Sequence, residues 1–189
     1  MAPRLHIITT STRPGRIGPS IAAWFHDAAK AHGGFEAVPV DLASFKLPVY
    51  DEPKHPATQI YEHDHTKAWS ASVAAADAYV FVLPEYNFMP PPSFSNALDY
   101  VYKEWNYKPA GFVSYGGISG GLRSAQVAKL HLTTLKVVPV VEAVVVPMAW
   151  QQLGTDQVFT PNDIQNDAAK TLLDELLRWA EALKPLRAN

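Results

Sequence analysis

The sequence of 189 residues contains no cysteine. This excludes a disulfide framework, a thiolate metal site and a cysteine nucleophile. An excess of one charge sign is also lacking, because 16 Lys and Arg residues stand against 18 Asp and Glu residues. A chain without a basic excess is not expected to bind nucleic acid. No apolar run approaches the length of a membrane span, so we expect no membrane association.

The chain also lacks internal repeats, low-complexity segments and any shift of composition that would mark a linker. Its length fits one medium domain, which we place over residues 1–189. The opening residues M-A-P-R-L-H-I-I reach the first expected strand at once and leave no room for a signal peptide. We therefore expect a cytoplasmic protein.

Strand-like and helix-like segments alternate along the sequence. Alternation of this kind predicts an α/β fold, with a five-stranded parallel sheet, right-handed crossovers and helices on both faces. Pro39 indicates an edge position for the second strand. The expected strands are 4–10, 35–42, 78–83, 110–115 and 140–146, and the expected helices are 19–32, 63–76, 93–105, 119–135 and 161–183.

The first loop, T-S-T-R-P-G-R-I-G-P-S at 10–20, joins a strand to a helix. The first N–H groups of a helix have no partner within it and attract anions. Ser11 adds a hydroxyl donor, and Arg13 and Arg16 add charged donors. The loop is neither a Walker loop nor a G-x-G-x-x-G fingerprint, and it suits one terminal phosphate. The alternative is a solvated turn whose arginines face water.

The second loop, P-E-Y-N-F-M-P-P-P at 84–92, follows the third strand. Its prolines fix backbone angles, so the loop could hold Tyr86, Asn87 and Phe88 beside a flat ligand. Exposed N–H groups from Glu85 to Phe88 could hydrogen-bond ring heteroatoms. The alternative is a stiff crossover whose aromatic rings only pack.

The third loop, S-Y-G-G-I-S-G-G at 114–121, follows the fourth strand. Its glycines permit a close approach of backbone to ligand, and Tyr115 could cover an aromatic ring. The N–H groups after Tyr115 could face a developing anion. The alternative is a flexible turn. All three loops lie at the carboxyl ends of strands, where ligands bind in sheets of this kind.

The segments S-T-R-P-G-R, P-E-Y-N and S-Y-G-G, each after a strand, resemble the NADPH-dependent FMN reductase family. N-A-L-D-Y at 96–100 and L-P-V-Y-D-E-P at 47–53 add to the resemblance. It implies a flavodoxin-like fold with strand order 2-1-3-4-5 and non-covalent FMN at the carboxyl edge of the sheet. It also implies NADPH or NADH as electron donor and a quinone, an azo compound or free flavin as acceptor.

By position, the resemblance implies three groups of FMN-binding residues. They are Ser11, Arg13, Arg16, Ile17 and Gly18 at the phosphate, Pro84, Glu85, Tyr86, Asn87 and Phe88 along the isoalloxazine, and Ser114, Tyr115, Gly116 and Gly117 at its pyrimidine end. Many family members have Ser or Asn at the position of Arg16, and Leu-Lys where Phe94 and Ser95 stand. Because the flavin carries the chemistry, no catalytic side chain is expected.

Two other functions fit the same fold, namely an electron-transfer module and a non-catalytic flavin-binding regulatory protein. The segment H-D-H at 63–65 is not favoured as a metal site, because residues i and i+2 do not share a helix face. Tyr100, Tyr102 and Trp105 suggest an exposed aromatic interface. The family resemblance implies a homodimer formed there, and pairing of dimers into a tetramer stays open. The alternative is that these rings fill the core.

Overall fold

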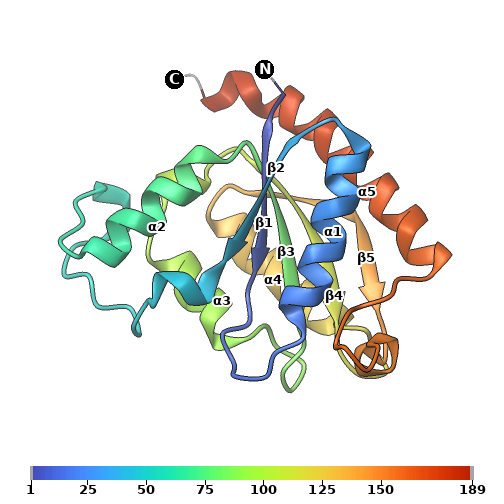
Figure 1. Ribbon diagram of the computed structural model, residues 1–189. Helices are drawn as coiled ribbons and strands as arrows, with labels where there is room; N and C mark the ends of the chain where they lie inside the picture. The colour runs from blue at the N-terminus through green and yellow to red at the C-terminus, as the bar shows by residue number, and fades with distance from the viewer. Residues whose placement is uncertain (1, 188–189) are drawn as a thin grey trace.

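The computed structural model describes residues 2–187 and contains one parallel sheet of five strands (Figure 1). The strands are β1 (Arg4–Thr9), β2 (Glu36–Asp41), β3 (Ala78–Pro84), β4 (Pro109–Tyr115) and β5 (Val138–Val146). Their order is β2-β1-β3-β4-β5, which confirms the predicted flavodoxin-like topology. Pro39 lies on the edge strand β2, opposite Ile7 of β1, as its missing N–H group requires.

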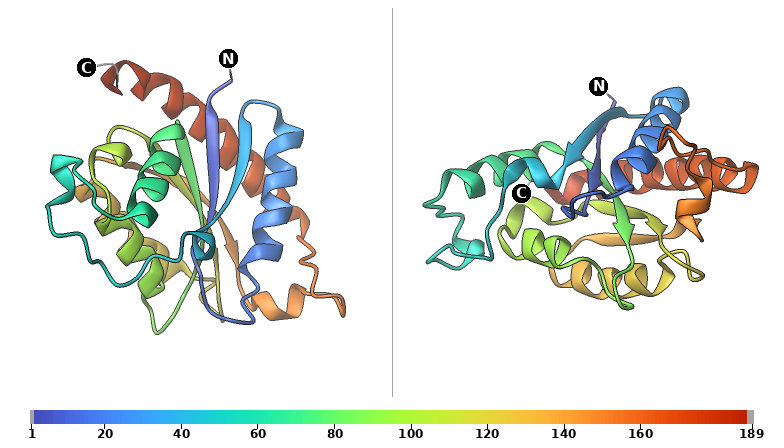
Figure 2. Two further views of the ribbon diagram at one scale, coloured as in Figure 1. Left: turned by 60° about the vertical axis from the view of Figure 1, so that its left-hand side comes forward. Right: turned by 60° about the horizontal axis from the view of Figure 1, so that its bottom comes forward.

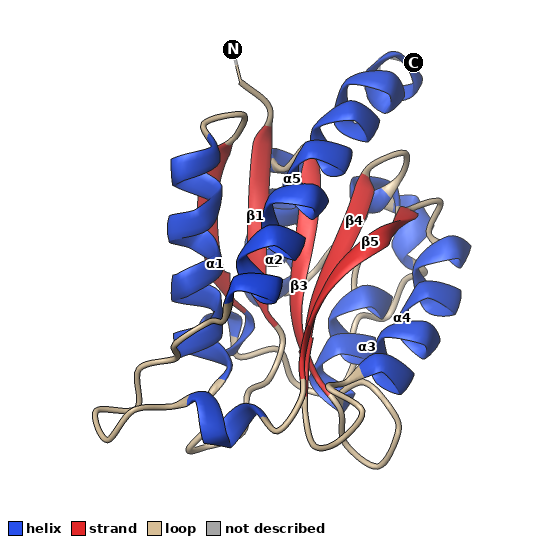
Figure 3. Ribbon diagram, turned by 90° about the vertical axis from the view of Figure 1, so that its right-hand side faces the viewer, coloured by secondary structure: helices blue, strands red, loops and turns tan. Residues whose placement is uncertain are grey.

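Five α-helices cover the two faces of the sheet. They are α1 (Gly18–His32), α2 (Asp64–Ala75), α3 (Pro92–Asp99), α4 (Leu122–Thr134) and α5 (Asp163–Leu183). Helices α1 and α5 pack their apolar sides on one face, and α2, α3 and α4 pack on the other. Figure 3 shows α1 and α4 on opposite sides of the strands.

The ends of the helices follow from local sequence signals. Helix α1 stops at Gly33, which adopts φ +74° and donates its N–H to the carbonyl of Ala29. Helix α5 begins with a capping box between Asn162 and Gln165. No helix within residues 2–187 has the length and apolar content that crossing a bilayer requires.

The predicted helix over 93–105 is shorter than expected, and the interface assigned to it is wrong. Helix α3 ends at Asp99, and a 3₁₀ turn follows at Lys103–Trp105. This break turns the rings inward, so Tyr100 and Trp105 are completely buried. Trp105 packs against Tyr79 with ring centroids 4.9 Å apart. The aromatic residues fill the core between α2 and the sheet instead of presenting an exposed face.

The carboxyl ends of the strands lie at the bottom of Figure 1 and turn toward the viewer in the right panel of Figure 2. The loops after β1, β3 and β4 converge there. The two ends of the chain lie at the opposite edge of the sheet. Strand β2 lies on one side of β1, and β3 lies on the other, so the direction in which strands are added to the sheet reverses at β1. Ligands of doubly wound folds usually bind at the carboxyl ends of the strands at such a switch point.

Candidate functional site

A cavity of about 260 Å³ lies at the carboxyl edge of the sheet, where the three loops meet. Nine of the fourteen predicted site residues line it, together with two residues that follow β5. The lining consists of Arg13, Arg16, Ile17, Pro84, Glu85, Tyr86, Tyr115, Gly116, Gly117, Ala149 and Trp150. Ser11, Gly18, Asn87, Phe88 and Ser114 do not line this cavity.

Ser11 and Gly18 instead support residues that line the cavity. Ser11 is completely buried, and its Oγ lies 2.6 Å from the hydroxyl oxygen of Tyr86. At Gly18 an added Cβ would lie only 2.7 Å from the hydroxyl oxygen of Tyr115, so a larger residue there would displace that ring. Burial, and then the neighbouring Tyr86, raise the pKa of Tyr115. The Tyr115 hydroxyl therefore keeps its proton at neutral pH and can donate a hydrogen bond.

The first loop supplies positive charge beside the N-terminus of α1. No side chain caps this helix end, which leaves it suited to an anion. Arg13 is exposed, whereas Arg16 is half-buried and forms a 2.5 Å ion pair with Asp41 at the end of β2. The Nε atom of Arg16 is buried and has no hydrogen-bond partner within residues 2–187. A charged donor of this kind fits an anionic group such as a flavin phosphate.

The tip of the second loop is a tight hairpin whose two central residues do not line the cavity. Tyr86 and Met89 exchange backbone hydrogen bonds of 2.9 and 3.0 Å. The two residues between them, Asn87 and Phe88, have φ of +51° and +72°, as a type I′ turn requires. Phe88 is 62% exposed. The N–H groups of Glu85 and Tyr86 are used within the fold, so the expectation that they face a ligand ring is wrong.

Glu85 joins the second loop to the third. Its carboxylate accepts hydrogen bonds from the Ser119 hydroxyl at 2.9 Å and from the Arg123 backbone N–H at 3.2 Å. The Arg123 guanidinium pairs with the other carboxylate oxygen at 3.3 Å and lies over the Phe88 ring at 4.0 Å. Only 9% of the Glu85 side chain is exposed. Its carboxylate therefore fixes two walls of the cavity relative to each other.

The third loop is fixed by the segment that follows β5. Gly116 donates its N–H to Val146, and its carbonyl accepts the N–H of Ala149 at 3.1 Å. The expectation that N–H groups here face an anion is therefore wrong for Gly116. The same contacts bring Trp150 over Gly117, where an added Cβ would lie 3.9 Å from the indole ring.

Trp150, like its neighbour Ala149, is a cavity residue that was not predicted from the sequence. Its ring is 55% exposed and forms part of the cavity lining. No motif surrounds it, and the usable signal was its position after the fifth strand, at the same edge of the sheet as the three loops. Ser119 and Arg123 were missed for a related reason, because their role depends on the contact with Glu85.

The long connection between β2 and α2 is hydrogen-bonded to α3 and to the residue that follows it. Asn96 donates to the carbonyl of Pro48 at 2.6 Å and accepts from the N–H of Tyr50 at 2.9 Å. Tyr100 donates to the carboxylate of Asp51 at 2.8 Å. The two segments N-A-L-D-Y and L-P-V-Y-D-E-P therefore contact each other directly.

The histidines of the H-D-H segment do come together, although the i, i+2 spacing argued against a shared face. His63 precedes the first turn of α2 and stacks on His65 with ring centroids 5.1 Å apart. Both rings face Asp51. Within the described residues 2–187, however, no group of three or more His, Asp or Glu side chains is arranged to hold a metal ion.

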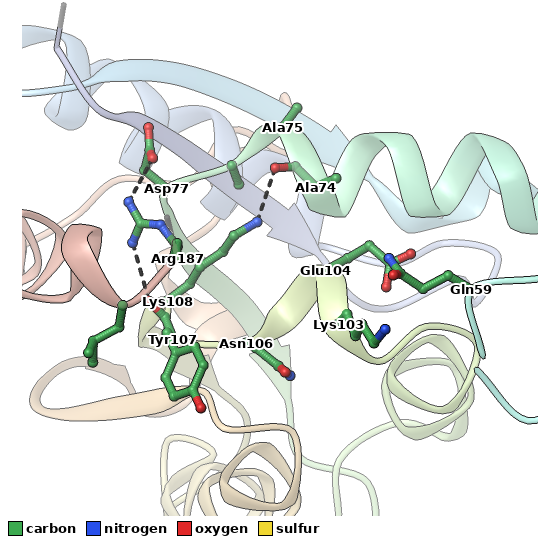
Figure 4. Close-up of a pocket in the computed structure, with 12 residues that line it drawn as sticks. Gln59, Ala74, Ala75, Asp77, Lys103, Glu104, Asn106, Tyr107, Lys108 and Arg187 are labelled. Atoms are coloured by element: carbon green, nitrogen blue, oxygen red, sulfur yellow. Dashed lines mark hydrogen bonds and ion pairs between the residues drawn. The ribbon is translucent and has the colours of Figure 1, made fainter. Parts of the chain in front are cut away.

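A second cavity, of about 440 Å³, lies at the opposite edge of the sheet (Figure 4). Lys108 there donates to the carbonyls of Val73 and Ala74, at the C-terminal end of α2. Arg187 pairs with Asp77 at 2.9 Å. Burial, and then the nearby Arg187, lower the pKa of Lys108 to about 7. Because both cations are committed to groups of the protein, we assign this cluster a structural role.

Comparison with known proteins gives a consistent result. Residues 3–151 match the model of the family described as NADPH-dependent FMN reductase. An NAD(P)H-dependent FMN reductase of Schizosaccharomyces pombe is 38% identical over 150 residues, which cover 78% of this chain and 75% of the relative. A second protein of that description, from a Nectria species, is 34% identical over 189 residues, covering 96% and 89% of the two chains.

Solved structures share the fold at lower identity. The flavoenzyme FerB of Paracoccus denitrificans, an NAD(P)H:(acceptor) oxidoreductase, superimposes with a TM-score of 0.74 at 17% identity, over 95% of this chain and 98% of that one. RosB, solved with bound 8-demethyl-8-formylriboflavin-5′-phosphate, gives a TM-score of 0.72 at 15% identity, over 97% and 81% of the two chains. On the family match and the two fungal relatives, this chain belongs to the NADPH-dependent FMN reductase family of oxidoreductases.

Proposed function

We propose that the protein is an NAD(P)H oxidoreductase that binds FMN non-covalently in the cavity at the carboxyl edge of the sheet. Its acceptor is a small molecule such as a quinone, an azo compound or free flavin. One observation carries the proposal: an arginine-rich loop at a helix N-terminus opens into a cavity walled by aromatic residues and glycines. Charge at one end and flat surfaces at the other match a phosphorylated ring system.

The residues divide into two functional groups. Arg13, Arg16 and the N-terminus of α1 hold the phosphate, while Tyr86 and Tyr115 border the ring system. Gly116 and Gly117 leave the third loop without side chains that would narrow the cavity, and Trp150 closes its outer wall. FMN, when bound, supplies the redox chemistry by taking up hydride from NAD(P)H and passing electrons to the acceptor.

Donor and acceptor use one opening of this cavity in turn, so we propose ping-pong kinetics. The support is that Tyr86, Tyr115 and Trp150 all border this one cavity, so a ring system bound there is reached from the same side by donor and acceptor. Initial rates with varied NADPH at several fixed quinone concentrations should give parallel double-reciprocal lines. Intersecting lines would contradict alternate use of the site. No oxidation of NADPH or NADH by the FMN-loaded protein with any quinone would contradict the oxidoreductase activity.

We also propose a homodimer, formed by a surface other than the buried aromatic rings around Trp105. Its support is the set of exposed apolar side chains near the site and along α4, which includes Phe88, Ile118, Leu122 and Leu130. Large exposed apolar side chains that gather on one surface are typical of interfaces. Sedimentation equilibrium tests this directly, and a mass of one chain over a wide concentration range would contradict it.

A further inference from the structure

Arg16 is shared between the cavity and a carboxylate outside it. Its side chain lines the cavity, and its Nη2 atom is paired with Oδ2 of Asp41. Asp41 is the last residue of β2 and lies opposite Thr9 of β1, so the sheet register sets it directly beside the first loop. The pair is partly shielded, with 19% of the Arg16 side chain and 42% of the Asp41 side chain exposed.

The carboxylate of Asp41 is held in place independently of Arg16. Its second oxygen, Oδ1, accepts the N–H of Ala43 at 3.1 Å and caps the 3₁₀ turn at Leu42–Phe45. Its backbone carbonyl accepts the hydroxyl of Ser44 at 2.7 Å. Asp41 is therefore a fixed anchor, and the guanidinium of Arg16 adjusts to it.

The anchor leaves one edge of the guanidinium available. A guanidinium carries five N–H donors in a planar fork, and the bond to Asp41 uses one end of that fork. Nε is buried and has no acceptor among the residues described. Buried charged donors in folded proteins almost always have an acceptor, and a phosphate takes two parallel bonds from an arginine.

From this arrangement we propose that Asp41 is a positioning residue, which orients Arg16 so that the cavity selects a flavin bearing a terminal phosphate over one without it. The inference rests on the proposed function and deepens it, because it assigns the choice between FMN and riboflavin to one ion pair. It also gives a role to an arginine where many family members have Ser or Asn. Asp41 does not touch the ligand, and its effect passes through Arg16.

The test compares the dissociation constants of FMN and riboflavin, measured by quenching of flavin fluorescence, for the wild-type protein, three single variants and one double variant. Asp41→Asn keeps an oxygen for the Ala43 N–H but removes the charge that holds Arg16. Arg16→Lys keeps a positive charge but loses the planar fork. Glu36→Gln is the matched control, because Glu36 begins the same strand and forms an exposed ion pair with Arg4 at the far edge of the sheet.

We expect Asp41→Asn and Arg16→Lys each to lower the preference for FMN over riboflavin by about tenfold, the loss expected for one charge-assisted hydrogen bond. The double variant should lose little more than either single one, because both changes break the same pair. Glu36→Gln should keep the wild-type preference. Unchanged riboflavin binding shows in each case that the variant is folded.

The experiment distinguishes failure of the positioning role of Asp41 from failure of the proposed function. Asp41→Asn with an unchanged preference, or with tighter FMN binding, overturns the positioning role and leaves the proposed function standing, provided that the wild-type protein binds FMN. A wild-type protein that binds neither flavin overturns the proposed function and this inference together.

Discussion

Gly121 gives the sharpest test of how the third loop is built. It precedes α4 with φ +83°, a conformation that costs an L-residue about 1–2 kcal/mol. An added Cβ would also lie 2.7 Å from the backbone nitrogen of Tyr115 and 2.9 Å from its carbonyl oxygen. Backbone atoms cannot rotate away, so the contact adds about 1–3 kcal/mol. Together these contributions should lower the free energy of unfolding of Gly121→Ala by about 2–5 kcal/mol.

Gly33→Ala is the matched control. Gly33 has a similar φ of +74°, but an added Cβ there meets nothing within 4 Å. It therefore carries only the conformational cost, about 1–2 kcal/mol. Thermal unfolding should show a Tm lower by about 4 °C for Gly33→Ala and by about 10 °C for Gly121→Ala, at about 3 °C per kcal/mol for a chain of this size.

The two variants should also differ in flavin binding. Gly121→Ala displaces Tyr115, which lines the cavity, whereas Gly33 lies at the far end of α1. We expect weaker FMN binding for Gly121→Ala alone. Equal losses of Tm in the two variants would refute the steric reasoning, and equal FMN affinities would refute the link between Gly121 and the cavity.

Three further changes test other parts of the structure. Glu85→Gln removes the charge that pairs with Arg123. Chemical denaturation should show a free energy of unfolding lower by about 1–3 kcal/mol, and FMN binding should weaken. A wild-type free energy of unfolding together with wild-type FMN affinity would contradict the role of Glu85 in joining the two loops. Asn96→Ala removes the hydrogen bonds to the carbonyl of Pro48 and from the N–H of Tyr50, and should speed amide hydrogen exchange in residues 43–61; unchanged exchange there contradicts the anchoring. Burial, and then Arg4, lower the pKa of His6 from 6.5 to about 4. The unfolded chain therefore binds more protons between these values, and the free energy of unfolding should fall by up to about 3 kcal/mol as the pH drops from 6.5 to 4. In His6→Gln this slope should be reduced, and a wild-type slope in that variant contradicts the assignment.

The sheet could be predicted because its strands are apolar runs with local boundary signals. Residues 78–83 form a nearly continuous apolar stretch, and Gly33 and Asn162 mark helix ends through their own backbone preferences. The order of the strands came from the family resemblance and not from these signals. The end of α3 at Asp99 was missed, because packing of Tyr100 and Trp105 into the core outweighs the local helical pattern.

The convergence of the three loops followed from topology, since parallel strands end at one edge. What each side chain does there could not be read from the sequence. The carboxylate of Glu85 is used by Ser119 and Arg123, and Arg16 is paired with Asp41, a residue 25 positions away. Contacts of this kind depend on the folded arrangement of separate loops. Trp150 follows β5 at the same edge, but its place at the cavity depends on the bonds of Met148 and Ala149 to the third loop, which no sequence pattern predicts.

The central claim is that the cavity at the carboxyl edge holds FMN and lets NAD(P)H reduce it. The most direct measurement is an anaerobic titration of the FMN-loaded, desalted protein with NADPH and, separately, with NADH, followed by visible absorption. The account predicts that the protein retains flavin and that at least one of the two donors bleaches it stoichiometrically. Retained flavin that neither donor bleaches, or loss of all flavin on desalting even at high protein concentration, would contradict it.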